Sequence, residues 1–144
     1  MAPTRNGWLV AAGTCSAVAS VAHLGCIVGG ASWYRFFGAG EQMAWMAERG
    51  EAFPTLVTLA IAIVLAGWAG FAFAGAGLIP RPPLLRPALV AIATVYFARA
   101  AALPFMLETM PDRGVAFLYW SSAIVLVVGV LHAIGLATCW RTLG

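Results

Sequence analysis

The sequence has 144 residues, of which 62% are hydrophobic and only 9% charged, and its mean hydropathy is +0.93. A soluble domain carries about a quarter charged residues, so this composition excludes an ordinary water-soluble fold. The net charge of +3 comes from scattered arginines with no lysine, which excludes nucleic acid as a partner.

Four apolar runs divide the chain, and each is longer than the roughly 20 residues that a helix needs to cross a bilayer. Their connections are too short to hold another domain. The sequence therefore predicts an all-α polytopic membrane protein, a single integral membrane domain over residues 1–144. We expect four transmembrane helices in an up-down bundle. The predicted spans are residues 8–31, 54–79, 84–107 and 115–140.

The first apolar run has the position of a secretory signal peptide but not its composition. Arg5 alone precedes it, and no clear small-x-small cleavage site follows it. The run also exceeds the usual length of about 7–15 residues for the apolar part of such a peptide. We therefore expect a retained helix. Its Gly25 and Gly29 have the four-residue spacing that allows close helix packing.

The loop that follows, residues 32–53, holds three of the five acidic residues. Its glycines at positions 38 and 40 permit a sharp turn with positive φ. The segment EQMAWMAERG then predicts a short helix that ends at Gly50. Glu41, Trp45 and Glu48 share one side of that helix. We expect a short amphipathic helix that lies at the outer interface or caps the bundle.

The second and third runs are separated by IPRPP, which must break any helix and predicts a tight hairpin. The second run contains GWAGFAFAGAG, whose small residues predict close packing inside the bundle. Homo-oligomerisation through the same face is the alternative. Pro104 lies inside the third run and predicts a kink, which membrane helices tolerate.

Arg99 lies near the midplane of the third predicted span. A lone guanidinium costs about 2.5–3.5 kcal/mol there on insertion scales, so we expect it to face the bundle interior and find a partner. Tyr96 shares its helix face, and Glu41 is the candidate carboxylate if the outer loop folds inward. Three interpretations stay open: a structural tie between helices, a site for an anionic or polar ligand, and a proton-relay or catalytic site with His23 or Glu41.

His23 and His132, on the first and last runs, invite a bis-histidine haem in a four-helix bundle. At a rise of about 1.5 Å per residue their heights differ by about 9 Å, which would require a strongly tilted ring. Neither histidine has a carboxylate beside it for a metal site. Cys15, Cys26 and Cys139 are predicted too far apart for a disulfide. We therefore expect no metal and no cofactor.

The charges also predict an orientation. If both termini lie inside, the inner segments carry four arginines and no acid, while the outer segments carry three arginines and all five acids. The positive-inside rule then favours a multi-pass protein of the bacterial cytoplasmic (inner) membrane with N-in and C-in topology. Membrane lipids are the partners that a basic inner face implies.

The stretch HLGCIVGGASWYRFFGAGEQMA resembles a group of small, uncharacterised bacterial four-helix integral membrane proteins. They share a first-helix histidine and a W-Y-R-F-F-G-A-G-E segment after that helix. The likeness extends over the whole chain, with a similarly placed arginine in the third span and histidine in the fourth. In layout the chain is also similar to DoxX-like small membrane proteins. The matching residues are His23, Gly25, Trp33, Tyr34, Arg35, Phe36, Phe37, Gly38, Gly40 and Glu41.

The leading functional hypothesis is a membrane protein that binds, or also transports, a small or lipidic ligand in an outward-facing pocket around Arg99. One alternative is a non-catalytic accessory subunit of a larger membrane complex. A second alternative is a membrane enzyme that uses His23 and Glu41 as acid and base, so the question of enzymatic activity stays open. The candidate ligand-binding residues are Arg99, His23, Glu41, Tyr96, Tyr34, Arg35, Trp33 and His132.

Overall fold

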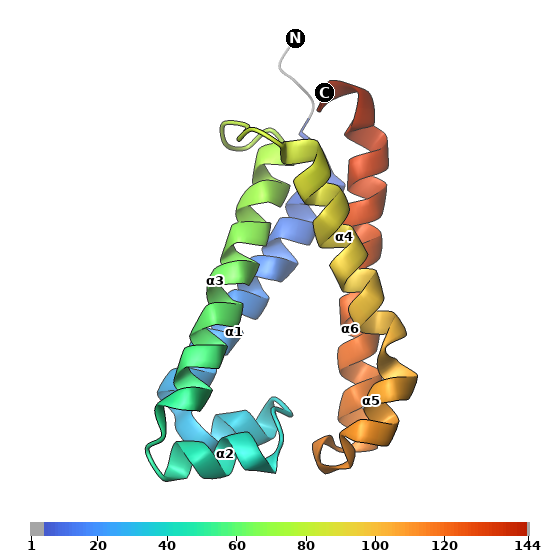
Figure 1. Ribbon diagram of the computed structural model, residues 1–144. Helices are drawn as coiled ribbons and strands as arrows, with labels where there is room; N and C mark the ends of the chain where they lie inside the picture. The colour runs from blue at the N-terminus through green and yellow to red at the C-terminus, as the bar shows by residue number, and fades with distance from the viewer. Residues whose placement is uncertain (1–4, 144) are drawn as a thin grey trace.

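The structure, a computed structural model, describes residues 5–143 and is all-helical, with no strand in that range (Figure 1). Helices α1, α3 and α6 are long and apolar enough to cross a membrane, and α4 with α5 adds a fourth span if the bent pair counts as one. The predicted all-α chain with several candidate spans is confirmed. The elements are α1 (Gly7–Phe36), α2 (Glu41–Glu48), α3 (Ala52–Gly75), α4 (Leu85–Ala101), α5 (Leu103–Thr109), η1 (Pro111–Arg113), α6 (Val115–Cys139) and η2 (Trp140–Thr142).

The last turns of α1 fold back on the helix. The backbone breaks at Gly30, whose φ of 65° and ψ of −150° are accessible to glycine but not to other residues. The break brings the indole ring of Trp33 over Gly25 and Gly29, and a Cβ atom on Gly25 would lie 2.6 Å from Trp33 Cζ3. The two glycines therefore make room for a side chain of their own helix, not for a neighbouring helix as their spacing suggested.

Two local predictions are confirmed. The short helix expected in the first loop is α2, and Gly50, with a φ of 70°, follows its end. The third predicted span is bent by 49° where α4 ends and α5 begins, beside Pro104. Proline lacks the N–H that would continue the α-helical hydrogen bonds, which explains the break.

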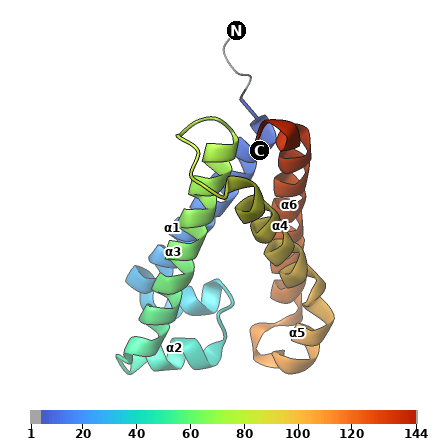
Figure 2. The same cartoon turned by 45° about the horizontal axis from the view of Figure 1, so that its top comes forward.

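The long segments form two antiparallel pairs, α1 with α3 and α4–α5 with α6 (Figures 1 and 2). Consecutive segments alternate in direction. The pairs meet at the end that carries both termini, which we call the apex, and they diverge toward α2 and α5. The expected four-helix up-down bundle is therefore not confirmed, because the axes of the two pairs diverge toward the end that holds α2 and α5.

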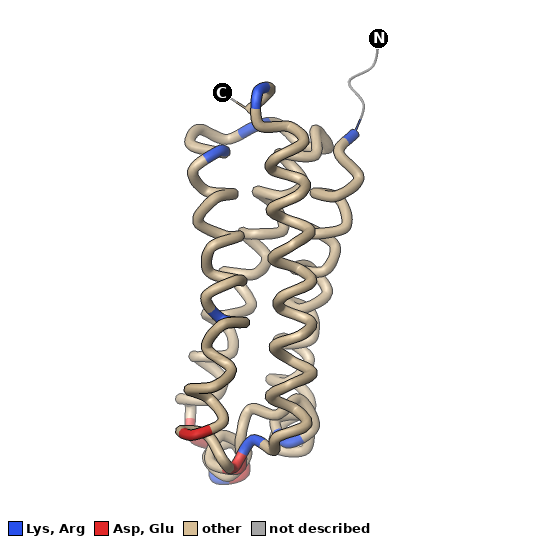
Figure 3. The backbone as a smooth tube through the Cα atoms, turned by 90° about the vertical axis from the view of Figure 1, so that its right-hand side faces the viewer, with Lys and Arg blue, Asp and Glu red and all other residues tan. Residues whose placement is uncertain are grey.

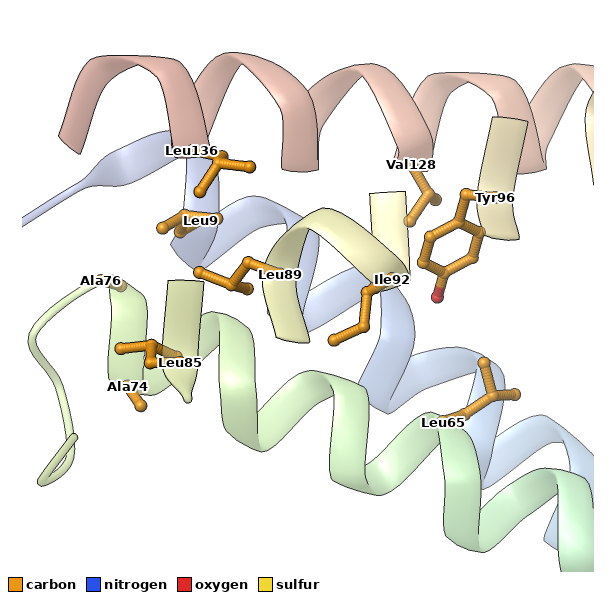
Figure 4. Packing of buried hydrophobic residues seen from close by; sticks show 10 residues of the cluster. All are labelled: Leu9, Leu65, Ala74, Ala76, Leu85, Leu89, Ile92, Tyr96, Val128 and Leu136. Carbon is orange, nitrogen blue, oxygen red and sulfur yellow. The ribbon is translucent and has the colours of Figure 1, made fainter. Parts of the chain in front are cut away.

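At the apex, the start of α1 packs against the end of α6. The Asn6 Oδ1 atom caps α1 by accepting a hydrogen bond from the Leu9 amide at 3.2 Å, and its Nδ2 donates to the Gly135 carbonyl at 2.8 Å. Leu9 is completely buried against Gly135, where a Cβ atom would lie 2.6 Å from Leu9 Cγ. The apolar core extends from here toward the middle of the molecule (Figure 4) and consists of Leu9, Leu65, Ala74, Ala76, Leu85, Leu89, Ile92, Tyr96, Val128 and Leu136.

At the opposite end, which we call the acidic end, the turn between α1 and α2 touches the start of α6. The ring of Phe117 packs so closely on Gly38 that a Cβ atom there would overlap it. A Cβ atom on Gly40 would lie 2.7 Å from Asp112 Oδ2. Both glycines have positive φ, 65° and 96°, so the sharp turn predicted from the sequence is confirmed.

The charged residues are segregated along the molecule (Figure 3). Every acidic residue lies at the acidic end, in α2, α5 and η1 or at the start of α3. Four arginines lie at or near the apex, in the segments that precede α1, connect α3 to α4 and follow α6, and at the start of α4; they are Arg5, Arg81, Arg141 and Arg86. The charge separation expected from the sequence is therefore present between the two ends of the fold.

Candidate functional site

Arg99, the residue on which the sequence analysis centred, is half-buried in α4 and faces α6. Its Nη1 donates to the hydroxyl of Ser122 at 3.2 Å, and its Nη2 donates to the hydroxyl of Ser121 at 3.4 Å. Both bonds are long for a charged donor, whose hydrogen bonds are usually about 2.7–2.9 Å. The guanidinium is thus held only by two hydroxyl groups of the neighbouring helix.

No carboxylate of residues 5–143 forms an ion pair with Arg99. A like charge, that of Arg113 in η1, is instead close enough to repel it. Arg113 likewise forms no ion pair within the described chain. We refer to Arg99, Arg113, Ser121 and Ser122 as the Arg99 cluster. It combines two positive charges with two hydroxyl groups and no acid, which is the composition of an anion site.

Glu41, proposed from the sequence as the partner of Arg99, binds Arg35 instead. The Glu41 Oε1 atom lies 2.6 Å from Arg35 Nη2, and Arg35 Nη1 lies 2.7 Å from Glu48 Oε1. The guanidinium of Arg35 therefore neutralises two carboxylates of α2 and ties this helix to the end of α1. Its hydrogen bonds hold the pKa of the Glu41 carboxyl below its usual value. The expected pairing of Glu41 with Arg99 is wrong, since Arg35 is only six residues away and already within reach.

Tyr96 and His132 come together in the core, which the sequence did not predict. Their rings lie 5.2 Å apart, and the Tyr96 hydroxyl lies 2.8 Å from the Ser16 hydroxyl on α1. His132 is fully buried, with Nδ1 2.9 Å from the Val128 carbonyl. A carbonyl oxygen can only accept a hydrogen bond, so Nδ1 carries the proton. Nε2 is then an acceptor, and it has no hydrogen-bond partner in the described chain. Tyr96 thus links α1 to α4, and within the described chain it forms no hydrogen bond with Arg99, the neighbour expected from the sequence.

The remaining candidate residues make separate local contacts. His23 is half-buried, with Nδ1 2.7 Å from the Ala19 carbonyl one turn earlier. Tyr34 is buried, and its hydroxyl accepts a hydrogen bond from Thr58 of α3 at 3.1 Å. Trp33 lies on the glycines of its own helix. The sequence predicts Trp33, Tyr34 and Arg35 at the mouth of a pocket. In the structure these three residues instead make contacts that stabilise the acidic end of the α1–α3 pair.

Two hollows lie nearer the apex than the Arg99 cluster. One is an open groove of about 770 Å³ between α4 and α6, lined mainly by apolar side chains such as Val90, Phe97 and Ala133. The other, of about 390 Å³, lies beside the α3–α4 loop and is lined by Arg81, Arg86 and prolines of that loop. We call it the loop pocket. In the sequence these two arginines indicate the orientation of the chain, and their position among prolines with no acid nearby is also a signal for an anion site.

The cysteines and histidines form neither a disulfide nor a metal cluster within the described chain. Cys15, Cys26 and Cys139 are free thiols. Within residues 5–143, no three His, Cys, Asp or Glu side chains gather where they could hold a metal ion. Neither observation assigns a redox or metal function to this fold.

Comparison with known proteins adds no assignment, because no family model, no curated protein and no solved structure matches this chain. The resemblance of residues 23–41 to a group of small four-helix membrane proteins therefore stays a prediction. What the chain does has to be inferred from the contacts of its own residues.

Proposed function

We propose that this chain is a multi-pass membrane protein that binds a small or lipidic anion at the Arg99 cluster. In this proposal α1, α3 and α6 each span a bacterial inner membrane, and α4 with α5 forms a fourth, broken span. Both termini face the cytoplasm, because the apex carries four arginines and no acid. The Arg99 cluster then lies on the outward side of the midplane, on the way to the acidic end.

The observation that carries the proposal is a half-buried arginine without a carboxylate. An arginine inside a membrane span is stable only with partners for its charge and its N–H groups. A guanidinium has five N–H donors, and Arg99 donates two long hydrogen bonds within the described chain, both to hydroxyl groups. Arg113 repels the charge of Arg99, whereas an arginine with a purely structural role would have a neighbour that attracts its charge. A bound carboxylate or phosphate would supply Arg99 with the charged acceptor that the described chain does not provide.

The proposal is tested by titrating the detergent-solubilised protein with a fluorescent long-chain carboxylate, parinaric acid. Replacement of Arg99 by Gln removes a charge-assisted hydrogen bond, worth about 1.5–3 kcal/mol, so the affinity should fall by about tenfold or more. Arg113→Gln should weaken binding in the same direction, because it removes the second charge. Arg35→Gln is the matched control, since Arg35 is an equally charged residue whose contacts are with α2.

Two results would contradict this proposal. The first is equal affinity of the wild type and Arg99→Gln for the carboxylate. The second is an Arg99→Gln protein that no longer folds while Arg113→Gln binds normally, which would assign Arg99 the structural role of joining α4 to α6. Far-UV circular dichroism of each variant separates loss of fold from loss of binding.

The contacts of Glu41 and His23 do not favour the alternative of acid/base catalysis. Glu41 forms an ion pair with Arg35, and the lowered pKa of its carboxyl makes this carboxylate a weak base near neutral pH. His23 donates Nδ1–H to a carbonyl of its own helix, which leaves only Nε2 for chemistry. Neither residue contacts the other or Arg99 in the hydrogen bonds and ion pairs of the described chain.

One observation favours the accessory-subunit alternative. Gly75 packs against Leu9 and Leu89, as the small-residue pattern of α3 predicted, whereas Cβ atoms on Gly67 and Gly70 would meet nothing within 4 Å in the described chain. An open pair of glycines on a membrane helix suits close contact with another helix. Gentle solubilisation followed by native mass spectrometry distinguishes a monomer from a homo-oligomer or a complex with a stoichiometric partner.

A further inference from the structure

We propose a second site, independent of the Arg99 cluster, at which the loop pocket binds a phosphate group. The pocket, of about 390 Å³, lies at the apex beside the loop that joins α3 to α4. Arg81, Arg86 and Leu143 line it together with three prolines. Leu143 comes from the segment after α6, so residues far apart in the sequence close the pocket from two sides.

The two arginines are held in place without being neutralised. Arg86 Nη2 donates to the Trp140 carbonyl at 2.9 Å, and its guanidinium carbon lies 4.7 Å from the centre of the Trp140 ring. Arg81 Nη1 donates to the Thr142 carbonyl at 2.6 Å. Each guanidinium has five N–H donors, and these contacts use a single donor on each. The charge of both side chains therefore stays available to a ligand, while their geometry is fixed by the C-terminal segment.

One of the free donors is already withdrawn from solvent. Arg86 Nε is buried and has no hydrogen-bond partner in the described chain. Buried polar groups almost always have a partner, which is either protein, an ordered water or a ligand. A guanidinium binds the oxygens of a phosphate through its N–H groups, and because Nε of Arg86 is closed off from solvent, a ligand would reach this side chain through its Nη groups.

The start of α4 adds backbone donors to the same pocket. Leu84, which precedes the helix, adopts a left-handed conformation with a φ of 61° and provides no side-chain cap. The first helical hydrogen bond runs from the Ala88 amide to the Leu84 carbonyl, so the amides of Leu85 and Arg86 have no partner within the helix. Pro87 has no amide hydrogen to satisfy. An uncapped helix start of this kind attracts anions through its free amides and its dipole.

The residues around the loop pocket favour an anionic ligand at the membrane interface. All acidic residues of the chain lie at the acidic end, so no carboxylate competes for these arginines (Figure 3). Leu84 and Trp140, which are 77% and 45% exposed, are apolar side chains next to the pocket and suit the boundary between lipid and water. The shared chemistry is a phosphate group, which either an anionic lipid headgroup or free inorganic phosphate could supply. Basic pockets at the ends of membrane helices bind lipid phosphates in this way.

The test compares lipids retained by the full-length protein in native mass spectrometry. The protein in a neutral detergent is mixed with equal amounts of phosphatidylglycerol and of a diacylglycerol with the same acyl chains, which lacks the phosphate. A parallel sample receives the diacylglycerol and inorganic phosphate. We expect selective retention of phosphatidylglycerol or of phosphate, and about a tenfold loss in Arg86→Gln and Arg81→Gln. Arg141→Gln, the matched control, removes the same charge from the same end but not from the pocket, and should change retention less than about twofold.

Each outcome decides the proposal. Selective retention of phosphatidylglycerol identifies a lipid headgroup as the source of the phosphate, and retention of inorganic phosphate identifies the free ion. Equal retention of both lipids without a phosphate adduct overturns the proposal. An equal loss in Arg141→Gln also overturns it, because the effect would then be diffuse attraction. If Arg86→Gln fails to fold through loss of its contact with Trp140, Arg81→Gln decides, since Arg81 is exposed and makes one hydrogen bond.

Discussion

The apex can be tested with a single methyl group at Gly135. A Cβ atom there would lie 2.6 Å from Leu9 Cγ and 3.1 Å from the Leu9 amide nitrogen. Carbon atoms normally approach to about 3.5–4.0 Å, so Gly135→Ala creates an overlap of about 1 Å. Leu9 has no exposed surface into which it could move, and Asn6 fixes the backbone on both sides of the contact. Overpacking of this kind costs about 1–3 kcal/mol.

The matched control is Gly67→Ala in α3, where the added Cβ would meet nothing within 4 Å in the described chain. Alanine favours a helix over glycine by about 1 kcal/mol, and both variants contain this gain. The difference between their free energies of unfolding therefore isolates the contact with Leu9. We expect Gly135→Ala to be less stable than Gly67→Ala by about 1–3 kcal/mol.

The assay is reversible unfolding in mixed micelles of neutral detergent and dodecyl sulfate, followed by far-UV circular dichroism. A difference below about 0.5 kcal/mol between the two variants would refute the reasoning, because an overpacked core usually loses at least about 1 kcal/mol. That result would mean that α1 and α6 do not meet at Gly135, and the convergence of the two helix pairs at the apex would have to be abandoned.

Two further contacts give predictions. The hydroxyl groups of Ser16 and Tyr96 are buried and lie 2.8 Å apart. In a double-mutant cycle of Ser16→Ala and Tyr96→Phe, followed by unfolding, we expect a coupling energy of about 0.6–1.5 kcal/mol. Additive changes in the free energy of unfolding would contradict the hydrogen bond. The Glu41 carboxyl, whose pKa Arg35 lowers, contributes stability above its unfolded pKa and loses it as pH falls through its folded pKa. Arg35→Gln should return that pKa toward its ordinary value in a carbon-13 NMR titration, and an unchanged value would contradict the pair.

The candidate site contains one residue that the sequence predicts and several contacts that it does not. Arg99 was recognised because a charge in an apolar span is conspicuous by itself. Its partners, Ser121 and Ser122, are ordinary polar residues of another helix, and only the packing of α4 on α6 selects them. The sequence favours Glu41 as a partner of Arg99 because Glu41 is among the acids nearest to it in height and follows two glycines that permit an inward turn. In the structure the turn at Gly38 and Gly40 instead places Glu41 beside Arg35.

The loop pocket was missed for a related reason. The arginines of PRPPLLRP were interpreted as a signal of membrane orientation, which depends on their number and not on their contacts. Their fixed geometry comes from carbonyls and a tryptophan at the far end of the chain, which no local pattern connects to this loop.

The sequence by itself determined the helices, the break at Pro104, the short α2 between its glycines and the separation of charge between the two ends. These depend on local chemistry: the length of apolar runs, the missing N–H of proline and the freedom of glycine at positive φ. The tertiary structure alone decided how the helices pair, that the pairs diverge from the apex, and which polar groups meet. Helices that are apolar on every side carry no sequence signal for the face that turns inward. That choice rests on how side chains such as Leu9 and Tyr96 fit against a glycine or a hydroxyl group of another helix.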